Sequence, residues 1–440
     1  MDRKISKKLT LWKNSKNRKP LILYGARQVG KTYILKKWGS SQFRKVFYLN
    51  FEENRNDLNK LFSGSLESAE IISKIEVIHL DTINTKHDLV IFDEIQECPR
   101  ALTSLKYFSE TRNELAICCA GSHLGLALHE ESFPVGQVDM LNLFPLDFEE
   151  FLAEENPQLA ALVSGLENYA KIDDFLHARL WNSLKSYYVT GGLPAAIQMY
   201  LDKRETLVDA YAGARNVQKT LITGYISDFA KHAEKENANH IHRIFENIPI
   251  QLSRTIDATG KKYVFKGVIP QKNKFESFAG PISWLIKSGL VIKAPILELP
   301  SLPLRAFAKE NSFKLYVFDI GILGAMLNLS PGTLIGQDYG LFKGFFAENF
   351  AAQEFIAAGA EELFSWVHRT SEIEFLRVFN DRVIPVEVKS GLGSRAKSLA
   401  VYAQRYAPTR MITLSGRAYQ KGKLVTNFPL YLAGKISADF

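Results

Sequence analysis

The chain has 440 residues, of which 46% are hydrophobic and 23% are charged. These fractions exclude a disordered or fibrous chain, and the length exceeds one hydrophobic core, so we expect about two to four domains. No run of about 18 apolar residues occurs and the charged N-terminus lacks an apolar segment, so we expect neither membrane insertion nor export. Cys98, Cys118 and Cys119 have no metal-ligand spacing, which indicates a reducing, cytoplasmic compartment.

The formal net charge of +8 is concentrated at the two ends of the chain. Residues 1–20 contain eight Lys/Arg against one Asp, and residues 381–440 contain ten against three acidic residues. Such basic ends are typical of surfaces that meet DNA phosphates, but ordinary solvated charge that keeps a protein soluble gives the same pattern.

The first predicted elements are a strand, a loop and a helix. The apolar run 21–24 predicts the strand, and apolar spacing after Thr32 predicts the helix. The loop fits the Walker A pattern G-x-x-x-x-G-K-[ST], whose glycines and helix N-terminus favour phosphate, so we expect ATP here. Lys31 is expected to reach the β- and γ-phosphates, and the Thr32 hydroxyl to bind Mg²⁺. The expected nucleotide-binding residues are Gly25, Ala26, Arg27, Gln28, Val29, Gly30, Lys31 and Thr32.

A second group of polar residues follows predicted buried strands. Residues 89–92 form such a strand and run into Asp93 and Glu94, the Walker B position, at the edge where parallel strands present ligands. Asp93 is expected to hold Mg²⁺ through water, and Glu94 to orient or deprotonate the attacking water. Ser122, after the strand 115–120, is a candidate γ-phosphate sensor, with a plain turn residue as the alternative. Two more predicted strands make five: 45–51 and 140–146.

The sequence resembles prokaryotic AAA-type ATPases in which a P-loop domain precedes a C-terminal domain of unknown function. The matching stretches are the loop 25–32 and residues 90–96, 120–122, 143–152 and 191–194. The resemblance implies the AAA+ strand order and the use of ATP. Many of these relatives carry Gly-Arg before the fifth strand, whereas this chain has Gly136-Gln137, so we assign no arginine finger.

The middle of the chain is predicted to be mainly helical. Helical periodicity extends over 151–230 and is interrupted by Gly191-Gly192-Leu193-Pro194, which forces a turn. Residues 239–290 resemble a winged-helix unit and include the basic and aromatic stretch 261–266, which is typical of a strand facing nucleic acid. Winged helices also contact proteins, so both kinds of partner stay open.

The last hundred or so residues resemble the core of PD-(D/E)xK nucleases. A helix at 345–355 carries Glu348, and a predicted hairpin of strands 371–379 and 382–389 carries Glu374, Glu387 and Lys389. A helix at 395–406 and a strand at 411–414 follow. The resemblance implies that the three carboxylates hold a divalent metal and that Lys389 supports the attacking hydroxide.

One feature weakens the expectation of nuclease activity. Glu374 stands where these nucleases usually have Asp. Its longer side chain puts the metal geometry in doubt, because Mg²⁺ demands near-ideal octahedral placement. An inactive nuclease-like fold with a salt-bridged hairpin is therefore the alternative.

The predicted fold is α/β in four parts. We expect an AAA+ P-loop domain with a parallel sheet at 1–165, a helical segment at 166–235, a winged-helix-like unit at 236–300 and a nuclease-like domain at 301–440. The expected function is Mg²⁺-dependent ATP binding and hydrolysis, coupled to nucleic acid. The alternatives are an ATP-gated, metal-dependent DNA nuclease and a nucleotide-driven protein switch; oligomerisation stays open.

Overall fold

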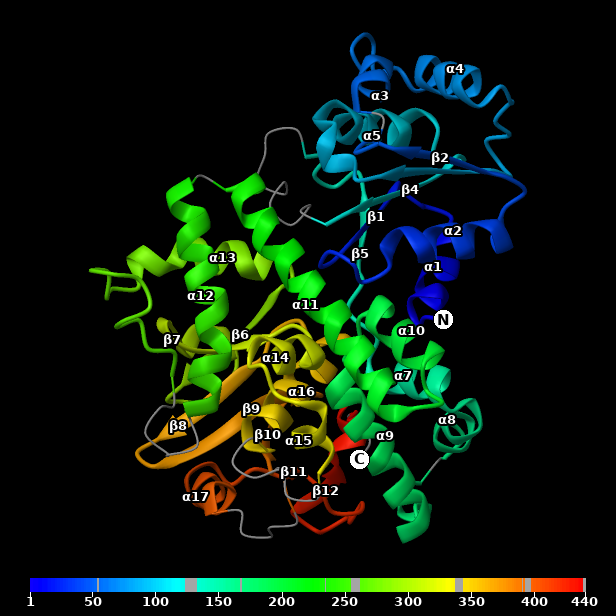
Figure 1. The fold of residues 1–440 in the computed structure, drawn as a ribbon. Helices are drawn as coiled ribbons and strands as arrows, with labels where there is room; N and C mark the ends of the chain where they lie inside the picture. Colours follow the sequence, from blue (N-terminus) through cyan, green and yellow to red (C-terminus); the bar gives the residue numbers. More distant parts are fainter. Residues whose placement is uncertain are drawn as a thin grey trace. The chain divides into compact units, whose positions relative to one another are not determined.

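The computed structural model describes residues 1–53, 55–122, 133–166, 168–233, 235–254, 262–336, 343–389, 391 and 397–437 (Figure 1). The chain divides into two compact units. The first contains Met1–Phe144 with Lys287–Gly289, and the second contains Pro145–Ile286 with Leu290–Phe440. Among the described helices, none is both long and apolar enough to cross a membrane.

The first unit is built on a five-stranded sheet in the order β2-β3-β4-β1-β5. All four strand pairs are parallel, so the carboxyl ends of the strands lie along one edge. The five predicted strands are all present, although the last ends at Asn142 and not at residue 146. The strands are β1 (Leu21–Tyr24), β2 (Val46–Asn50), β3 (Leu89–Asp93), β4 (Ala116–Gly121) and β5 (Asp139–Asn142).

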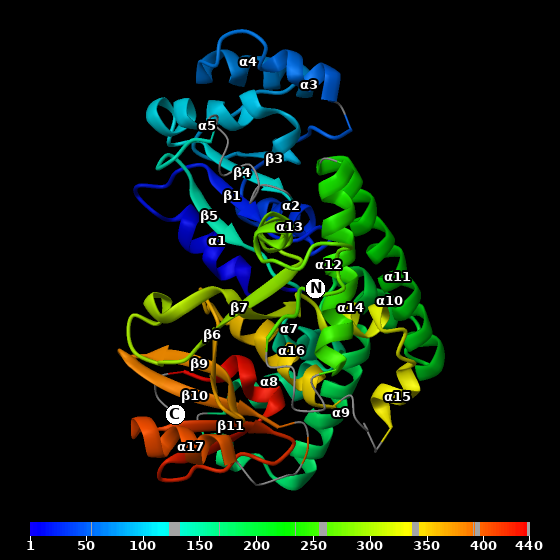
Figure 2. The same ribbon diagram turned by 90° about the vertical axis from the view of Figure 1, so that its left-hand side faces the viewer.

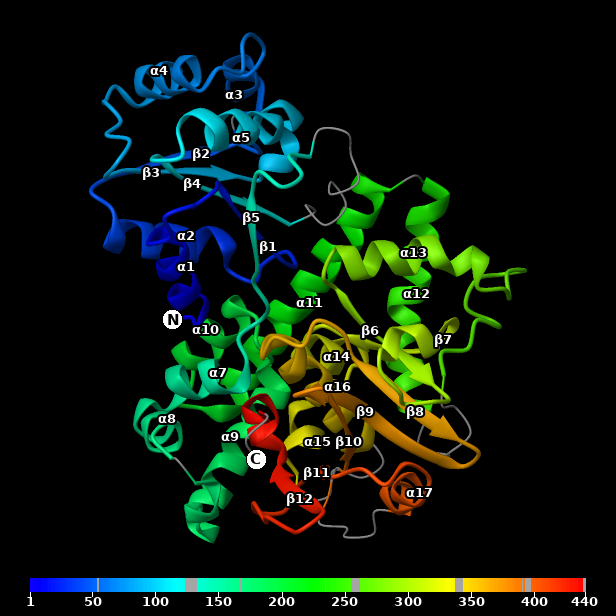
Figure 3. The same cartoon turned by 180° about the vertical axis from the view of Figure 1, so that it is seen from behind.

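Helices cover both faces of this sheet, as Figures 1 and 3 show from opposite sides. On one face, α1 and α2 pack through the rings of Trp12 and Trp38, whose centroids are 6.2 Å apart. On the other face, Phe51, Phe62 and Phe92 form an aromatic cluster with centroids 5.8 to 5.9 Å apart under the remaining helices. The helices are α1 (Ile5–Lys13), α2 (Lys31–Gln42), α3 (Arg55–Leu61), α4 (Ser68–His79), the 3₁₀ turn η1 (Ile95–Glu97) and α5 (Pro99–Thr111).

The second unit begins with helices, as the periodicity predicts. These are α7 (Phe148–Glu155), α8 (Pro157–Ser164), η2 (Tyr169–Lys171), α9 (Asp174–Thr190), α10 (Pro194–Asp202), α11 (Leu207–His232), α12 (Lys235–Arg254) and α13 (Glu276–Lys287). Further helical elements follow later in the chain: η4 (Leu304–Phe307), α14 (Ile320–Met326), α15 (Pro331–Ile335), α16 (Lys343–Ala357), α17 (Lys397–Tyr406) and η6 (Leu430–Lys435).

A seven-stranded sheet in the order β12-β11-β10-β9-β8-β6-β7 organises the rest of this unit. β9 pairs antiparallel with both β8 and β10, whereas β11 pairs parallel with β10. α16 and α17 pack on this sheet (Figure 2). The strands are β6 (Val291–Leu297), β7 (Ala308–Val317), β8 (Phe364–His368), β9 (Ser371–Phe379), β10 (Arg382–Val388), β11 (Met411–Ser415) and β12 (Val425–Pro429).

The boundary expected at residue 300 falls inside a hairpin. β6 and β7 pair antiparallel, with Val291 opposite Val317, and β6 also pairs parallel with β8. The β6–β7 hairpin therefore belongs to the same sheet as β8 to β12, which lie beyond residue 301. The first compact unit also ends at Phe144, earlier than the expected limit at 165.

The stretch 191–194 has a structural role in the second unit. Gly191 has a φ of +66°, and a Cβ on Gly192 would lie 2.1 Å from the carbonyl oxygen of Leu146. The Gly192 N–H donates to Oδ2 of Asp319 at 2.6 Å, and the Leu146 N–H donates to the Gly192 carbonyl at 2.7 Å. Only glycine fits this close backbone approach, which joins three distant segments of the chain.

Candidate functional site

The loop between β1 and α2 has backbone angles that require glycine. Gly25 has a φ of +148° and Gly30, the N-cap of α2, has a φ of +95°. A Cβ on Gly25 would lie 2.1 Å from the Leu143 carbonyl oxygen. The loop therefore turns tightly at both glycines and leads directly into the N-terminus of α2, the geometry that suits an anion.

Lys31 is a cation held inside this loop. Its Nζ donates to the carbonyl oxygens of Gly25 at 3.0 Å and Ala26 at 2.9 Å, and the residue is only 6% exposed. Burial lowers the pKa of Lys31 to about 8, although Glu94 and Asp93 oppose the shift. Its closest described partners are neutral carbonyls, so no described acid pairs directly with the buried ammonium, and a phosphate would supply that counter-charge.

Asp93 joins the loop to the end of β3. The Thr32 hydroxyl donates to Oδ2 of Asp93 at 2.8 Å, and the Tyr48 hydroxyl donates to the same oxygen at 2.7 Å. Burial raises the pKa of Asp93, while these two hydrogen bonds oppose that rise. A buried carboxylate beside a hydroxyl is an all-oxygen ligand pair of the kind that Mg²⁺ prefers.

Glu94 follows Asp93 in a left-handed backbone conformation, with a φ of +49°. Its Oε2 accepts hydrogen bonds from Nε2 of Gln96 at 2.6 Å and from the Ser122 hydroxyl at 3.3 Å. Ser122 follows β4, which neighbours β3, so two strand ends position this carboxylate. Glu94 is thereby oriented as a general base would need to be.

The structure brings Lys31, Thr32, Asp93, Glu94 and Ser122 to the same edge of the sheet, since each lies on or beside the loop, β3 or β4. Sequence reasoning missed two contacting side chains. Tyr48 reads as an ordinary strand residue, and only the alternation of partly buried and buried residues along β2 hints that it lies outside the core. Gln96 has no pattern of its own, because its contact depends on the η1 turn.

The C-terminal candidates lie on neighbouring elements: Glu348 on α16, Glu374 on β9, Glu387 on β10 and Lys389 just after it. Glu387 is only 1% exposed, and its Oε1 lies 2.6 Å from Nζ of Lys389. Glu374 accepts a hydrogen bond from the Val388 N–H at 2.9 Å. Burial, and next the charge of Glu348, raise the pKa of Glu374 to about 8.

A lysine that the sequence did not reveal lies among these acids. Nζ of Lys314, on β7, is 3.1 Å from Oε2 of Glu348 and also forms an ion pair with Glu372. The Tyr316 hydroxyl donates to the same Glu348 oxygen at 3.4 Å. The pKa of Lys314 is raised, because the acids around it outweigh the effect of its burial.

The expected shared metal site is not formed by these acids. In the part of the chain that the structure describes, no group of three or more His, Cys, Asp or Glu side chains could hold a metal ion. The physical reason is that cations and a backbone N–H already contact the carboxylates: Lys314 pairs with Glu348, the Val388 N–H donates to Glu374, and Lys389 pairs with Oε1 of Glu387. The buried Oε2 of Glu387 has no hydrogen-bond partner among the described residues. The acids therefore do not fit a divalent metal as placed.

Family models match three successive parts of the chain. Residues 17–152 match an AAA domain. Residues 182–333 match a domain of unknown function, DUF8612, and residues 343–432 match another, DUF4143. A search of curated proteins finds no match to this sequence.

Several solved structures share distant similarity with the chain. A Walker-type ATPase of Pyrococcus abyssi is 15% identical, with a TM-score of 0.46, and the alignment covers 74% of this chain and 95% of that one. RuvB of Thermotoga maritima is 14% identical, with a TM-score of 0.33 and coverage of 66% and 89%. The Aeropyrum pernix Orc1 protein, solved in complex with DNA, is 14% identical, with a TM-score of 0.28 and coverage of 74% and 91%. Given the family match and the parallel sheet with its loop, residues 17–152 form an AAA-type, ATPase-like P-loop domain.

Proposed function

We propose that the P-loop domain binds ATP together with Mg²⁺ and hydrolyses it. The observation that carries this proposal is the buried Lys31 ammonium, enclosed by a loop with two glycines at positive φ. This arrangement places a fixed cation and inward-facing backbone beside the N-terminus of α2, where a triphosphate would find its counter-charge.

Each side chain then has a distinct role. Lys31 exchanges its loop carbonyls for the β- and γ-phosphate oxygens, and Thr32 and Asp93 would provide oxygen ligands for Mg²⁺. When bound, Mg²⁺ offsets the charge of the phosphate oxygens. Glu94, held by Gln96 and Ser122, takes a proton from the attacking water.

Nucleotide binding to Lys31→Ala tests the proposal. We expect affinity for a fluorescent ATP analogue to fall at least about tenfold, since a charge-assisted contact to phosphate is lost. Lys37→Ala is the matched control: Lys37 lies on the same helix, is exposed and pairs with Asp2 at 2.8 Å. Equal affinity of the wild type and Lys31→Ala, in a protein that stays folded, would refute the ATP site.

A second candidate function is coupling of this ATPase to nucleic acid. It is supported by the basic ends and by the arrangement of α12, α13 and the β6–β7 hairpin. The Tyr263 N–H donates a hydrogen bond to the carbonyl oxygen of Phe313, on β7 of this hairpin, at 2.8 Å. Helices followed by a hairpin are the parts of a winged helix, as expected for 236–300. DNA affinity should fall linearly on a log–log plot against salt, and replacing the exposed Lys421 and Lys423 should flatten the slope. Absence of DNA binding at low salt would favour the protein switch.

We also propose that residues 301–440 have a nuclease-like fold. Its support is the order α16, β8, β9, β10, α17, β11, with an antiparallel meander and then a parallel strand. The placement of the acids gives no support to metal-dependent cleavage. The other proposed domains are 1–165, 166–235 and 236–300, although the first compact unit ends at Phe144 and the β6–β7 hairpin crosses residue 300. The buried cysteines, which form no disulfide among the described residues, fit a cytoplasmic protein.

A further inference from the structure

We propose that a cavity between α12, the segment 262–268, β7 and α16 binds the phosphate group of a nucleotide or nucleic-acid strand without a metal ion. The cavity has a volume of about 450 Å³. It lies within the second compact unit and is separate in sequence from the P-loop. The inference therefore does not rest on ATP hydrolysis.

The charge of the cavity lining favours an anion. Arg254, Lys262, Lys266 and Lys314 line it, and Glu348 is the only acid among the described residues of its lining. Lys314 is already paired with Glu348, but Arg254, Lys262 and Lys266 form no ion pair with any residue that the structure describes. Three cations that no described acid compensates, around one hollow, create a positive potential that a phosphate would offset.

The backbone that carries the two exposed lysines is fixed in place. The Gln251 side chain bridges to Val264: its Oε1 accepts from the Val264 N–H at 2.8 Å, and its Nε2 donates to the Val264 carbonyl at 2.7 Å. Nε2 also donates to Oδ1 of Asn247 at 2.6 Å. Lys262 and Lys266 flank this anchored residue, so their backbone is ordered before any ligand arrives.

A buried hydroxyl beside the lysines has no partner in the described part of the chain. Tyr263 lines the cavity and is 5% exposed, and its hydroxyl forms no hydrogen bond to a described residue. Its ring is held by stacking on Phe313, with centroids 6.1 Å apart. A buried polar group without a partner costs free energy, and a phosphate oxygen would accept its hydrogen bond.

The same geometry disfavours a metal ion. A metal at this cavity would need acidic ligands, but the Glu348 carboxylate already forms an ion pair with Lys314 and accepts a hydrogen bond from the Tyr316 hydroxyl. The Lys314 ammonium thus supplies internally the positive charge that a metal would bring. Phosphate can bind here by charge and hydrogen bonding alone, with no bond broken.

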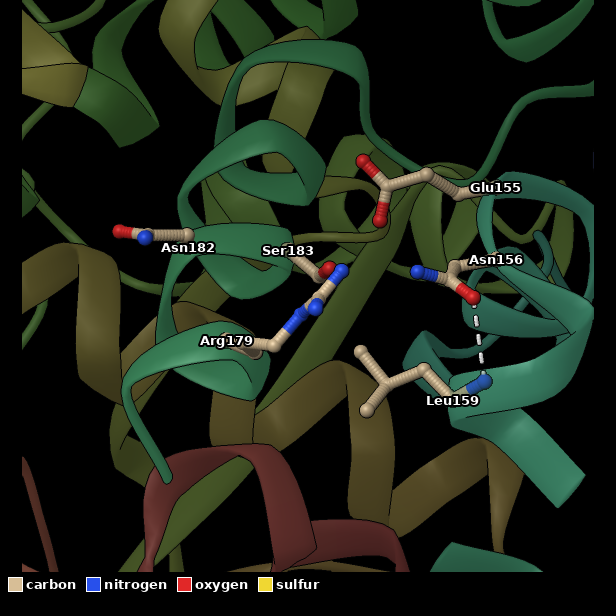
Figure 4. Close-up of a pocket in the computed structure, with 6 residues that line it drawn as sticks. All are labelled: Glu155, Asn156, Leu159, Arg179, Asn182 and Ser183. Atoms are coloured by element: carbon tan, nitrogen blue, oxygen red, sulfur yellow. Dashed lines mark hydrogen bonds between the residues drawn. The ribbon is translucent and has the colours of Figure 1, made fainter. Parts of the chain in front are cut away.

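A second cavity of the same unit shows the contrast. It has a volume of about 340 Å³ and is lined by residues of α7, α8 and α9. Figure 4 shows the Glu155 carboxylate and the Arg179 guanidinium pointing toward the same space. One acid and one base balance each other there, so that cavity lacks the surplus positive charge of the first.

The test measures binding of a labelled 5′-phosphorylated trinucleotide in EDTA. The full chain carries Lys31→Ala, so that the P-loop does not contribute. We expect Lys262→Gln combined with Lys266→Gln to weaken binding at least about tenfold. Lys274→Gln, an exposed lysine nearby in the chain but outside the cavity lining, should have no effect. Equal affinity of all three proteins would overturn the proposal.

Further experiments identify the ligand and test whether a metal ion takes part in binding. Competition by AMP at the same concentration as the unlabelled trinucleotide would indicate a nucleotide ligand, and competition by the trinucleotide alone would indicate a strand. Tyr263→Phe should weaken binding about three- to tenfold without unfolding the protein. Binding that appears only with Mn²⁺, or cleavage of the probe, would show that a metal site operates and would refute the inference.

Discussion

The Thr32 hydroxyl donates a hydrogen bond of 2.8 Å to Oδ2 of Asp93 and so joins the start of α2 to the end of β3. The two residues are 61 positions apart in the sequence. The Tyr48 hydroxyl from β2 reaches the same oxygen. Three elements of the sheet domain therefore fix one carboxylate, and the predictions for the P-loop domain follow from that arrangement.

Tyr48→Phe should raise the Mg²⁺ concentration needed for half-maximal ATP hydrolysis by about tenfold. The variant removes a hydrogen bond that orients Asp93, and loss of such a supporting contact typically weakens metal binding by about 10- to 100-fold. Initial rates over a Mg²⁺ titration measure the effect. Tyr33→Phe, an exposed tyrosine on α2, is the control. An unchanged Mg²⁺ requirement would show that Tyr48 does not position Asp93.

ATP affinity should fall as the pH rises through about 8. Burial lowers the pKa of Lys31 to about 8, so the unliganded protein releases that proton above this pH, whereas bound phosphate would retain it. One linked proton changes affinity by up to about tenfold per pH unit. Isothermal titration from pH 7 to 9.5 measures the slope. The slope should vanish in Lys31→Ala; a slope that persists there would assign the titration to another group.

Gly192→Ala should lower the free energy of unfolding by about 1 to 3 kcal/mol or more. The added Cβ would lie 2.1 Å from the Leu146 carbonyl oxygen and 2.9 Å from the Leu146 nitrogen, backbone atoms that cannot rotate away. Gly280→Ala is the control, because a Cβ there, inside α13, would meet no atom within 4 Å beyond its chain neighbours and the backbone of its own helix. Urea denaturation measures the free energy of unfolding of both variants. Equal stability of Gly192→Ala and Gly280→Ala would mean that the backbone at 191–194 shifts easily to accommodate the Cβ.

Lys389→Ala should leave ATP hydrolysis unchanged and lower the free energy of unfolding by about 1 to 3 kcal/mol near neutral pH. Glu387 is 1% exposed and loses its partner. Burial already raises the pKa of Glu387 above its unfolded value, so the folded state binds its proton more readily. The cost should therefore increase as the pH rises and shrink as it falls, when Glu387 is neutral. A loss that is independent of pH would contradict this account.

Local patterns were sufficient to predict the P-loop, the strand before Asp93 and all five strands of the first sheet. They were sufficient because glycines at fixed spacing and apolar runs depend on the neighbouring residues alone. Tyr48 and Lys314 could not be predicted in this way. Their partners, Asp93 and Glu348, are 45 and 34 residues away in the sequence, and strand order alone brings them together.

In the C-terminal region, too, local spacing predicts contacts between near neighbours but not contacts between residues that are distant in the sequence. The spacing of Glu387 and Lys389 correctly indicates two side chains on one face, and they form an ion pair. Whether acids from α16, β9 and β10 share a metal depends on which cation lies between them. That cation comes from β7, in a hairpin whose membership of the same sheet has no signature in the sequence.

In the proposed mechanism, Glu94 activates water at an ATP site formed by Lys31, Thr32 and Asp93. Measurement of ATP binding and single-turnover hydrolysis in Glu94→Gln separates this role from nucleotide binding, since glutamine keeps the shape of the side chain and removes the base. We expect ATP to bind with wild-type affinity and to be hydrolysed at least about a hundredfold more slowly. Hydrolysis at the wild-type rate in this variant would contradict the account.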